Sequence, residues 1–303
     1  MMQNGLNPDI LVCRSEHFIS EDIKRKLALF CNVKREAVIQ SIDASTIYDV
    51  PILMQEEGLD TVALKKLALK DNQAPDLEQW KKFLKRHKNP KHEVEIGLIG
   101  KYVELQDSYK SILESFIHAG ASNQVKVNVR FIHSEHLNMG NIEKKLKGLN
   151  GILVAPGFGE RGVEGKIKAV RYTRENNIPF LGICLGMQMA VIEYSRTILG
   201  LKKANSTEMN ESTTAPVINL MEEQKNIIDK GGTMRLGSWD CELKKGTLAS
   251  KIYGGVPSIA ERHRHRFEFN NDYKEQLEEA GMVASGINKK TGLVEIIEIP
   301  EHP

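Results

Sequence analysis

The sequence predicts an α/β protein whose mostly parallel sheet carries helices on both faces and is followed by antiparallel strands. From Glu93 to Ser195, apolar strand-like runs alternate with helical segments, which is typical of a parallel sheet covered on both sides. Beyond about Gly200 the pattern changes to short strands and turns, which indicates added antiparallel strands. A length of 303 residues is enough for about two domains.

The N-terminal segment, Met1 to about Lys70, has a different pattern of short strand-like and helical pieces, and we predict that it forms a separate small domain. It holds the strand-like "PDILVCRS" and the helical pieces "SEDIKRKLALFCNV" and "PILMQEEGLDTVALKKLAL". Ser20 is the expected N-cap of the first helix, with Glu21 and Asp22 in its first turn. A segment this short makes a small core on its own, so we predict that 1–70 is the remnant of a larger domain.

A polar helix and linker are expected over 71–92, and the main domain over 93–303. Its predicted strands are "EVEIGLIGKY", "VKVNVRFIH", "NGILVAPG" and the run Pro179 to Ile183. The predicted helices between them are "DSYKSILESFIHAG", which should end at Gly120, "NIEKKLKGL", "GKIKAVRYTRENN" and the apolar stretch after Cys184. Further strands are expected in "GGTMRLGSWDCEL", "RHRFEFN" and "GLVEIIEIP".

Composition excludes several classes of function. A formal net charge of +2 gives no reason to expect a nucleic-acid or membrane surface. The four cysteines show no CxxC spacing, which argues against a zinc site or a disulfide framework and fits a reducing compartment. No signal peptide or long apolar run is visible, so a cytoplasmic location is predicted.

The stretch Gly182-Ile183-Cys184-Leu185-Gly186 has the arrangement of a nucleophile elbow with cysteine in the place of serine. Small residues two before and two after Cys184 let the chain turn sharply from strand to helix. The N-terminus of the following helix then points at the thiol, which is expected to favour the thiolate. The alternative interpretation is a buried structural cysteine, the commoner role of this residue.

The loop "APGFGERG", Ala155 to Gly162, follows a buried strand and is a candidate oxyanion hole. Its glycines can turn backbone N–H groups toward a ligand. Taken alone, the loop could equally be a phosphate cradle or a simple turn. The phosphate interpretation is weak because neither a GK[ST] ending nor GxGxxG is present.

Several motifs together carry a resemblance to a known family. "PFLGICLGMQ", "APGFGERGVEGKI", "ANSTE", "GGTMRLG" and "ERHRHRFEFNN" resemble the class I glutamine amidotransferase domain of the CTP synthase family. The N-terminal segment resembles the last part of the same family's synthase (amidoligase) domain. The resemblance implies a flavodoxin-like amidotransferase fold, preceded by a remnant of a P-loop-type α/β synthase domain.

The resemblance implies a reaction and a set of site residues. In the family a cysteine thiolate attacks the side-chain amide of L-glutamine, ammonia is released, and a tunnel carries it to UTP that ATP has phosphorylated. Cys184 matches the nucleophile. The positions that match the oxyanion hole and the glutamine site are Gly157, Leu185, Gly186, Met187, Gln188, Glu208 and Arg266. Arg266 and Glu208 suit the substrate's α-carboxylate and α-ammonium. Without the other motifs, "ERHRHR" would be interpreted as a solvated edge strand.

The resemblance also implies nucleotide contacts and partners. Lys26 matches a position that contacts the pyrimidine nucleotide, and Asp43 lies in a segment that contacts ATP, where Ile42 replaces the family's usual lysine. Arg161 lies in the region where GTP acts as activator. No cofactor is expected in the amidotransferase domain, whereas the parent enzyme uses ATP and Mg²⁺ and assembles as a homotetramer.

Two family features are missing from the sequence. The family's base pair of His and Glu lies in an "HPE" segment that we expect about ten residues after the "HP" matched by His302-Pro303. The phosphate loop and magnesium carboxylates of the synthase domain have no counterpart before Lys70. We therefore expect a truncated chain that carries the glutaminase half. The alternatives are a non-catalytic glutamine-binding or oligomer-interaction fragment, or another class I amidotransferase or γ-glutamyl hydrolase.

Overall fold

The computed structural model describes residues 5–70, 74–220 and 235–303, and divides into two compact units. The first unit comprises Met1–Lys91 with His118–Val125, and the second comprises His92–Ile117 with Lys126–Pro303. The predicted linker and the "GGTMRLG" motif lie partly outside the described residues, at 71–73 and 231–234. Within the described ranges, no helix has the length and apolar character needed to cross a membrane.

The first unit is built on two parallel strands, β1 (Leu11–Ser15) and β2 (Val38–Ile42). Its helices and short 3₁₀ turns are α1 (Glu21–Phe30), η2 (Arg35–Ala37), η3 (Ile47–Asp49), α2 (Val50–Glu56), α3 (Leu59–Lys66) and α4 (Glu78–Lys88). The predicted cap of α1 is confirmed, since the Ser20 hydroxyl accepts a hydrogen bond from the Ile23 N–H. Gly58, at φ 75°, separates α2 from α3.

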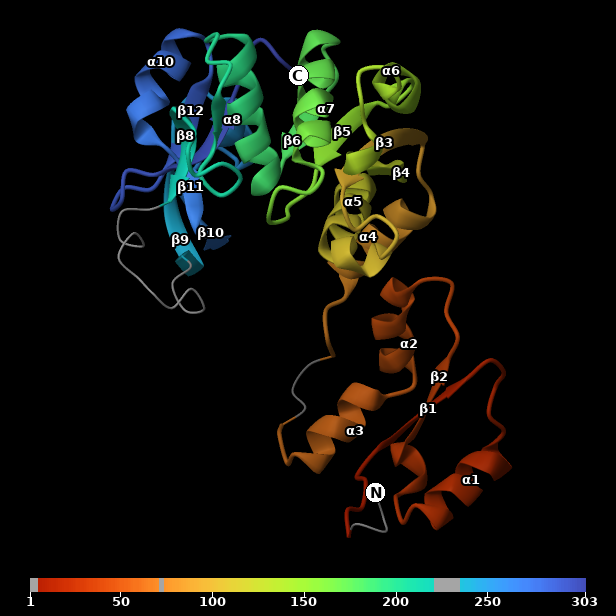
Figure 1. The fold of residues 1–303 in the computed structure, drawn as a ribbon. Helices are drawn as coiled ribbons and strands as arrows, with labels where there is room; N and C mark the ends of the chain where they lie inside the picture. The colour runs from red at the N-terminus through yellow and green to blue at the C-terminus, as the bar shows by residue number, and fades with distance from the viewer. Residues whose placement is uncertain (1–4, 71–73, 221–234) are drawn as a thin grey trace. The chain divides into compact units, whose positions relative to one another are not determined.

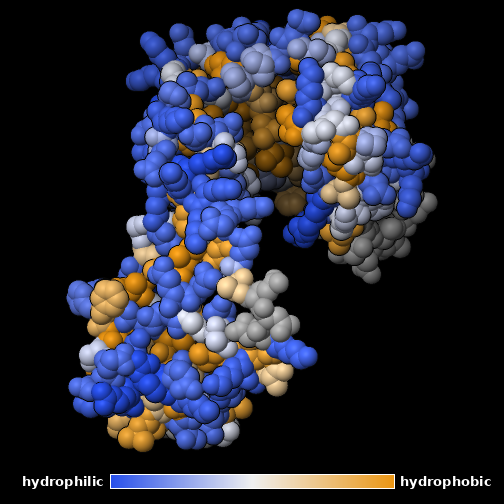
Figure 2. Space-filling view, turned by 180° about the vertical axis from the view of Figure 1, so that it is seen from behind, coloured by the Kyte–Doolittle hydropathy of each residue, from blue (hydrophilic) through white to orange (hydrophobic). Residues whose placement is uncertain are grey.

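Large apolar side chains remain at the surface of this unit. Phe18 and Leu29 are each 81% exposed, and Phe30 is 76% exposed. Figure 2 shows hydrophobic side chains among the polar ones on its surface. A core this small leaves such side chains uncovered.

The second unit contains the expected parallel sheet, formed by β3 (His92–Gly100), β4 (Val125–His133), β5 (Gly151–Val154) and β6 (Phe180–Gly182). The strand order is β4-β3-β5-β6, and the pairs β3/β5 and β5/β6 are parallel. This is the order of a flavodoxin-like doubly wound sheet. The connections are η4 (Gln106–Tyr109), α5 (Lys110–Asn123), η5 (Ser134–His136), α6 (Ile142–Leu146), α7 (Val163–Glu175) and α8 (Leu185–Thr197) (Figure 1).

Alternate strand residues face two different helical layers, which confirms that both faces of the sheet are covered. Ile99 and Val154 belong to a core cluster with side chains of α6, α7 and α8. Their neighbours Leu98 and Leu153 belong to another cluster, which includes Ile112 and Phe116 of α5. The predicted end of α5 at Gly120 is wrong, because the helix continues to Asn123 and Gly120 is buried within it.

The strands after α8 form two further sheets, and the expectation that they are antiparallel is only partly right, because β7 pairs with β8 in parallel. One has the order β11-β8-β7, from β7 (Ala204–Ser206), β8 (Ala215–Leu220) and β11 (Phe267–Phe269). The other has the order β10-β9-β12-β13, from β9 (Arg235–Leu243), β10 (Ser258–His265), β12 (Val283–Ile287) and β13 (Val294–Glu298). The short elements α9 (Leu248–Ile252), η7 (Asn271–Tyr273) and α10 (Lys274–Glu279) complete the unit.

The predicted strand "RHRFEFN" is wrong as a single element. The chain leaves one sheet after His265 and enters the other at Phe267, so Arg266 lies at the break. Among the described strands, β10 is at the edge of its sheet and is mostly exposed, as the alternative interpretation of "ERHRHR" expects.

A buried cluster of charges joins these two sheets. Arg235 of β9 donates to both carboxylate oxygens of Glu295, at 2.6 and 2.7 Å, and its Nε lies 3.1 Å from Glu268 of β11. His263 Nε2 lies 2.5 Å from the Glu295 carboxylate. The Arg235, Glu268 and Glu295 side chains are at most 5% exposed, so each charge depends on its partners rather than on water.

The two carboxyl groups of the cluster have opposite pKa shifts. Burial acts to raise the pKa of Glu295, but hydrogen bonds from His263 and Arg235 outweigh it and lower this pKa to about 2. Burial raises the pKa of Glu268 to about 7, against the Arg235 cation. Glu295 is therefore the ionised partner of Arg235 at neutral pH, whereas Glu268 is close to its midpoint.

We expect Gly165→Ala to destabilise the fold although Ala favours helices over Gly by about 1 kcal/mol. A Cβ at Gly165, in the first turn of α7, would lie 1.8 Å from the Ser134 carbonyl oxygen. Overpacking of this kind costs about 1–3 kcal/mol or more, so the clash should win. Urea unfolding measures the loss. Gly140→Ala, where the nearest atom is a side-chain oxygen at 3.4 Å, should stay near wild type. Equal stability of the two variants would contradict the packing.

We expect Glu295→Gln to lower the free energy of unfolding by about 3 kcal/mol at pH 7, because a buried Arg235 then loses its main partner. The folded pKa of Glu295 lies below its ordinary value of 4.5, so its contribution is present above pH 4.5 and is lost as the pH falls toward about 2.

The difference between the variant and the wild type should therefore shrink below pH 4.5 in urea titrations at stepped pH. Glu279→Gln, at an exposed position of α10, is the matched control and should change little. A difference that does not vary with pH would count against the ion pair.

Candidate active site

Cys184 lies at the corner between β6 and α8, where the sequence predicts it. Its backbone angles are φ 55° and ψ −109°, a region that non-glycine residues rarely occupy. Such a conformation costs about 1–3 kcal/mol and persists only where the surroundings enforce it. The positive φ turns the thiol outward from the strand, as in a nucleophile elbow.

The two flanking glycines are required because backbone lies directly against them. A Cβ on Gly186 would lie 2.1 Å from the Val154 carbonyl oxygen at the end of β5. A Cβ on Gly182 would lie 2.6 Å from the backbone of Gly186 itself. Larger residues would push α8 away from the sheet, so the spacing of the motif reflects close packing of the turn.

Two backbone N–H groups point at the Cys184 sulfur. One belongs to Leu185, at the start of α8, and the other to Gly157, in the loop after β5. Both hydrogen bonds favour the thiolate. The pair also provides the donors that an oxyanion would need when the sulfur attacks a carbonyl.

Burial nevertheless raises the pKa of the Cys184 thiol above its ordinary value of 9.0. The Leu185 N–H opposes this shift, the Glu268 carboxylate adds to it, and the Gly157 N–H and the Lys166 cation oppose it. The helix N-terminus thus favours the thiolate, as expected, through the Leu185 N–H, but desolvation outweighs both N–H groups and the pKa of the thiol is raised.

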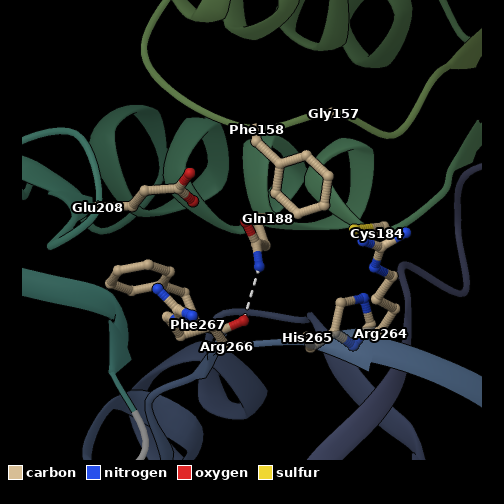
Figure 3. A pocket seen from close by; sticks show the side chains of 9 residues that line it. All are labelled: Gly157, Phe158, Cys184, Gln188, Glu208, Arg264, His265, Arg266 and Phe267. Carbon is tan, nitrogen blue, oxygen red and sulfur yellow. Dashed lines mark hydrogen bonds between the residues drawn. The ribbon is translucent and has the colours of Figure 1, made fainter. Parts of the chain in front are cut away.

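Cys184 opens into a cavity of about 360 Å³, a size suited to a small-molecule ligand. The cavity is lined by Gly157, Phe158, Cys184, Gln188, Glu208, Arg264, His265, Arg266 and Phe267. In the view of Figure 3, Glu208 and Arg266 lie on one side of the pocket and Cys184 on the other, with Phe158 and Gln188 between them.

The polar groups of the pocket are held by backbone contacts. The Glu208 carboxylate accepts a hydrogen bond from the Gly159 N–H at 2.7 Å. The Gln188 side-chain amide donates to the Phe267 carbonyl oxygen at 2.8 Å (Figure 3). Glu208 thus presents a negative charge and Arg266 a positive charge, an arrangement complementary to a zwitterion such as a free amino acid, whereas Arg264 lies on the Cys184 side in the view of Figure 3.

The structure gathers most of the predicted site residues into this one pocket. Gly157, Gln188, Glu208 and Arg266 all line it with Cys184. Leu185 contributes only its N–H group, since its side chain is buried in the core. Two predicted residues, Gly186 and Met187, are not among its lining residues, and the Gly186 N–H donates to Ile183 instead.

The predicted nucleotide residues lie in the first unit. Lys26 is on the exposed face of α1. Asp43 accepts a hydrogen bond from Arg14 at 2.8 Å and lines a second cavity of about 510 Å³. That cavity is lined by Ile42, Asp43, Ala44, Asp49, Ile52, Leu53, Lys81, Leu84, Lys85 and Lys88, so Lys26 and Asp43 do not share it.

His302 lies in a small cavity with Arg174, Glu193 and Met282, and its Nε2 is 3.3 Å from the Thr173 carbonyl oxygen. It is not among the residues that line the Cys184 pocket. His265 does line that pocket, and burial, aided by the His263 charge, lowers its pKa to about 4. Among the described residues, no group of three His, Cys, Asp or Glu side chains could hold a metal ion.

Sequence reasoning missed several residues of the pocket. Phe158, Arg264, His265 and Phe267 line it, and all lie within two residues of the predicted positions Gly157 and Arg266. Two lysines behind the loop, Lys101 and Lys166, are also missed. Both are buried, at 7% and 0% exposure, a location that no pattern in the sequence indicates for lysine.

Comparisons with known proteins place the chain in a family. The family model described as "Glutamine amidotransferase class-I" matches residues 104–303, and "CTP synthase N-terminus" matches residues 1–69. The CTP synthase of Flavobacterium psychrophilum is 70% identical over 303 residues, 100% of this chain and 56% of that protein. The CTP synthase of Bacteroides fragilis is 55% identical over 298 residues, 98% of this chain and 55% of that protein.

This chain therefore spans about half the length of these curated relatives. A solved structure titled "Trypanosoma brucei CTPS - glutaminase domain with bound acivicin" aligns with a TM-score of 0.65 at 39% identity. The alignment covers 69% of this chain and 82% of that one. The chain belongs to the class-I glutamine amidotransferase family, in its CTP synthase branch.

Proposed function

We propose that this chain carries the glutaminase half of a glutamine-dependent CTP synthase, with L-glutamine bound in the Cys184 pocket. The observation that carries the proposal is the arrangement inside one cavity. A thiol with two backbone N–H donors lies on one side, and a carboxylate and a guanidinium lie on the other. The side-chain amide of glutamine would lie at the thiol, and its α-carboxylate and α-ammonium would lie at the guanidinium and the carboxylate.

The proposed chemistry follows from these positions. The Cys184 sulfur attacks the side-chain amide carbon, and the carbonyl oxygen becomes an oxyanion held by the N–H groups of Gly157 and Leu185. The C–N bond then breaks, the nitrogen takes a proton, and ammonia leaves. Water hydrolyses the resulting glutamyl thioester and regenerates the thiol.

Substrate recognition is assigned to the charged groups. Arg266 would bind the α-carboxylate and Glu208 the α-ammonium, while Gln188 fixes the backbone beside Arg266 through the Phe267 carbonyl. The solved glutaminase domain of the Trypanosoma brucei protein has acivicin bound. We infer that a glutamine-like amino acid can occupy the corresponding pocket here.

The parent reaction, amination of UTP to CTP with ATP and Mg²⁺, is proposed from the family. Lys26 and Asp43 would contribute to its nucleotide sites, and Arg161, which pairs with Glu135 at 2.6 Å, to activation by GTP. The homotetramer and the cytoplasmic location stay predictions of the sequence.

A second candidate function is glutamine binding without efficient turnover. Attack by Cys184 needs a base, because the pKa of its thiol is raised. The imidazole that lines the pocket in the described structure is that of His265, whose pKa is lowered from 6.5 to about 4. Such an imidazole is two to three orders of magnitude less basic than a free histidine, which favours slow catalysis by this chain alone.

We expect the diazo-ketone analogue of glutamine, 6-diazo-5-oxo-L-norleucine, to label Cys184 in the folded chain at neutral pH. Intact mass and peptide mapping should show one label per chain on Cys184, and none in Cys184→Ser. Cys241 is an internal control, since it is buried and its pKa is raised to about 11. A folded chain that resists labelling would remove the proposed site.

Ammonia release from glutamine, measured beside the Flavobacterium psychrophilum relative, separates the two candidates. Loss of a triad base leaves about 10³–10⁴-fold catalysis over water, far below an intact site. Labelling together with such slow release supports the binding function for this chain alone. Release at the rate of the relative would show that the described pocket supplies its own base.

A further inference from the structure

Two buried lysines lie directly behind the loop that carries Gly157. Lys101 follows β3 and Lys166 belongs to α7, and they are 7% and 0% exposed. A Cβ built on Gly157 would be 3.4 Å from Lys101 Cε and 3.7 Å from Lys166 Nζ. Both ammonium groups donate to backbone carbonyl oxygens, and among the described residues neither forms an ion pair with a carboxylate, so both place positive charge under the loop at a desolvation cost.

Lys101 acts on one particular peptide group of the loop. Its Nζ donates a hydrogen bond to the Phe158 carbonyl oxygen. The backbone at Lys101 is itself anchored, because the N–H groups of Lys101 and Tyr102 both donate to the Tyr109 hydroxyl at 3.2 Å. The backbone from which the Lys101 side chain extends is therefore held in place.

The N–H group on the other edge of the same peptide belongs to Gly159, and it donates to Glu208 at 2.7 Å. The C=O and N–H of a trans peptide point in opposite directions, and no cis peptide occurs in the described chain. Fixing the Phe158 oxygen toward Lys101 thus fixes the Gly159 N–H toward Glu208. A cation on the oxygen also polarises the peptide and strengthens its N–H as a donor.

We propose that Lys101 is a positioning residue for the amino-acid end of the glutamine site, acting on Glu208 through the peptide between Phe158 and Gly159. The inference rests on the proposed function of this pocket. Gly159 holds one carboxylate oxygen of Glu208. The other oxygen accepts no hydrogen bond from the described residues and is available to an α-ammonium group.

Lys166 provides a matched control because its contact has a different consequence. Its Nζ donates to the Ala155 carbonyl oxygen at 2.7 Å, and the next residue is Pro156, which has no N–H to direct. The Lys166 cation lowers the pKa of Cys184. Lys166 therefore acts on the thiol, whereas Lys101 acts on Glu208.

The test compares Lys101→Met and Lys166→Met in the full chain, with folding checked by circular dichroism. Each protein is reacted with 6-diazo-5-oxo-L-norleucine and with its N-acetyl derivative, which lacks the α-ammonium charge. The ratio of the two labelling rates measures recognition of the ammonium. Alkylation by iodoacetamide across pH 6–10 measures the thiol independently of substrate recognition.

We expect Lys101→Met to lower the rate ratio at least about tenfold while the alkylation profile stays in place. Lys166→Met should leave the ratio within about twofold and move the alkylation midpoint to higher pH, since a nearby cation is lost. Glu208→Gln should remove the preference for the analogue with a free ammonium group. Adding Lys101→Met to Glu208→Gln should not change the rate ratio further, because both changes act on one interaction.

An unchanged ratio in Lys101→Met overturns the inference while the proposed function stands. Failure of the wild type to react with either analogue overturns the proposed function instead. If Lys101→Met does not fold, Lys101→Gln replaces it, since its amide can fill the site without the charge. Lys101→Gln should lower the rate ratio at least about threefold. A rate ratio equal to that of the wild type would also overturn the inference.

Discussion

The site depends on the close approach of α8 to the end of β5. The Val154 carbonyl oxygen accepts a hydrogen bond from the Ile183 N–H at 3.1 Å. The same oxygen would lie 2.1 Å from a Cβ on Gly186, so only glycine fits there. This contact holds the turn that gives Cys184 its φ of 55°. Because β5 also leads into the loop with Gly157, the same strand sets the positions of the thiol and of both N–H groups that face it.

Charge is distributed unequally around this turn. Behind the loop, Lys101 and Lys166 provide positive potential without a described carboxylate partner, near the place where a thiolate or an oxyanion would form. Beyond the pocket, the cluster of Arg235, Glu268 and Glu295 is largely balanced within itself. Glu268 nevertheless connects the two regions, since its negative charge raises the pKa of Cys184.

A raised thiol pKa and a prepared oxyanion hole are compatible. Burial excludes water from the thiol, which keeps it protonated, but it also makes each N–H group and each lysine more effective once negative charge develops. The pocket as described is thus organised for the charged state of the reaction more than for the resting thiol. Proton removal is the step for which the lining residues offer least, as the low pKa of His265 indicates.

The sequence alone determined the order of strands and helices, the corner at Cys184 and the small residues beside it, because apolar periodicity and glycine spacing are local properties. Motif resemblance identified Gly157, Gln188, Glu208 and Arg266, which the fold then brought to one cavity. It did not show that the chain changes sheets at Arg266, since "RHRFEFN" alternates like one strand. Only the tertiary structure decided the contacts of Lys101 and Lys166, because a lysine's burial depends on segments far away in the chain. The thiol pKa was decided in the same way, since desolvation by the assembled pocket outweighs the local effect of the helix N-terminus.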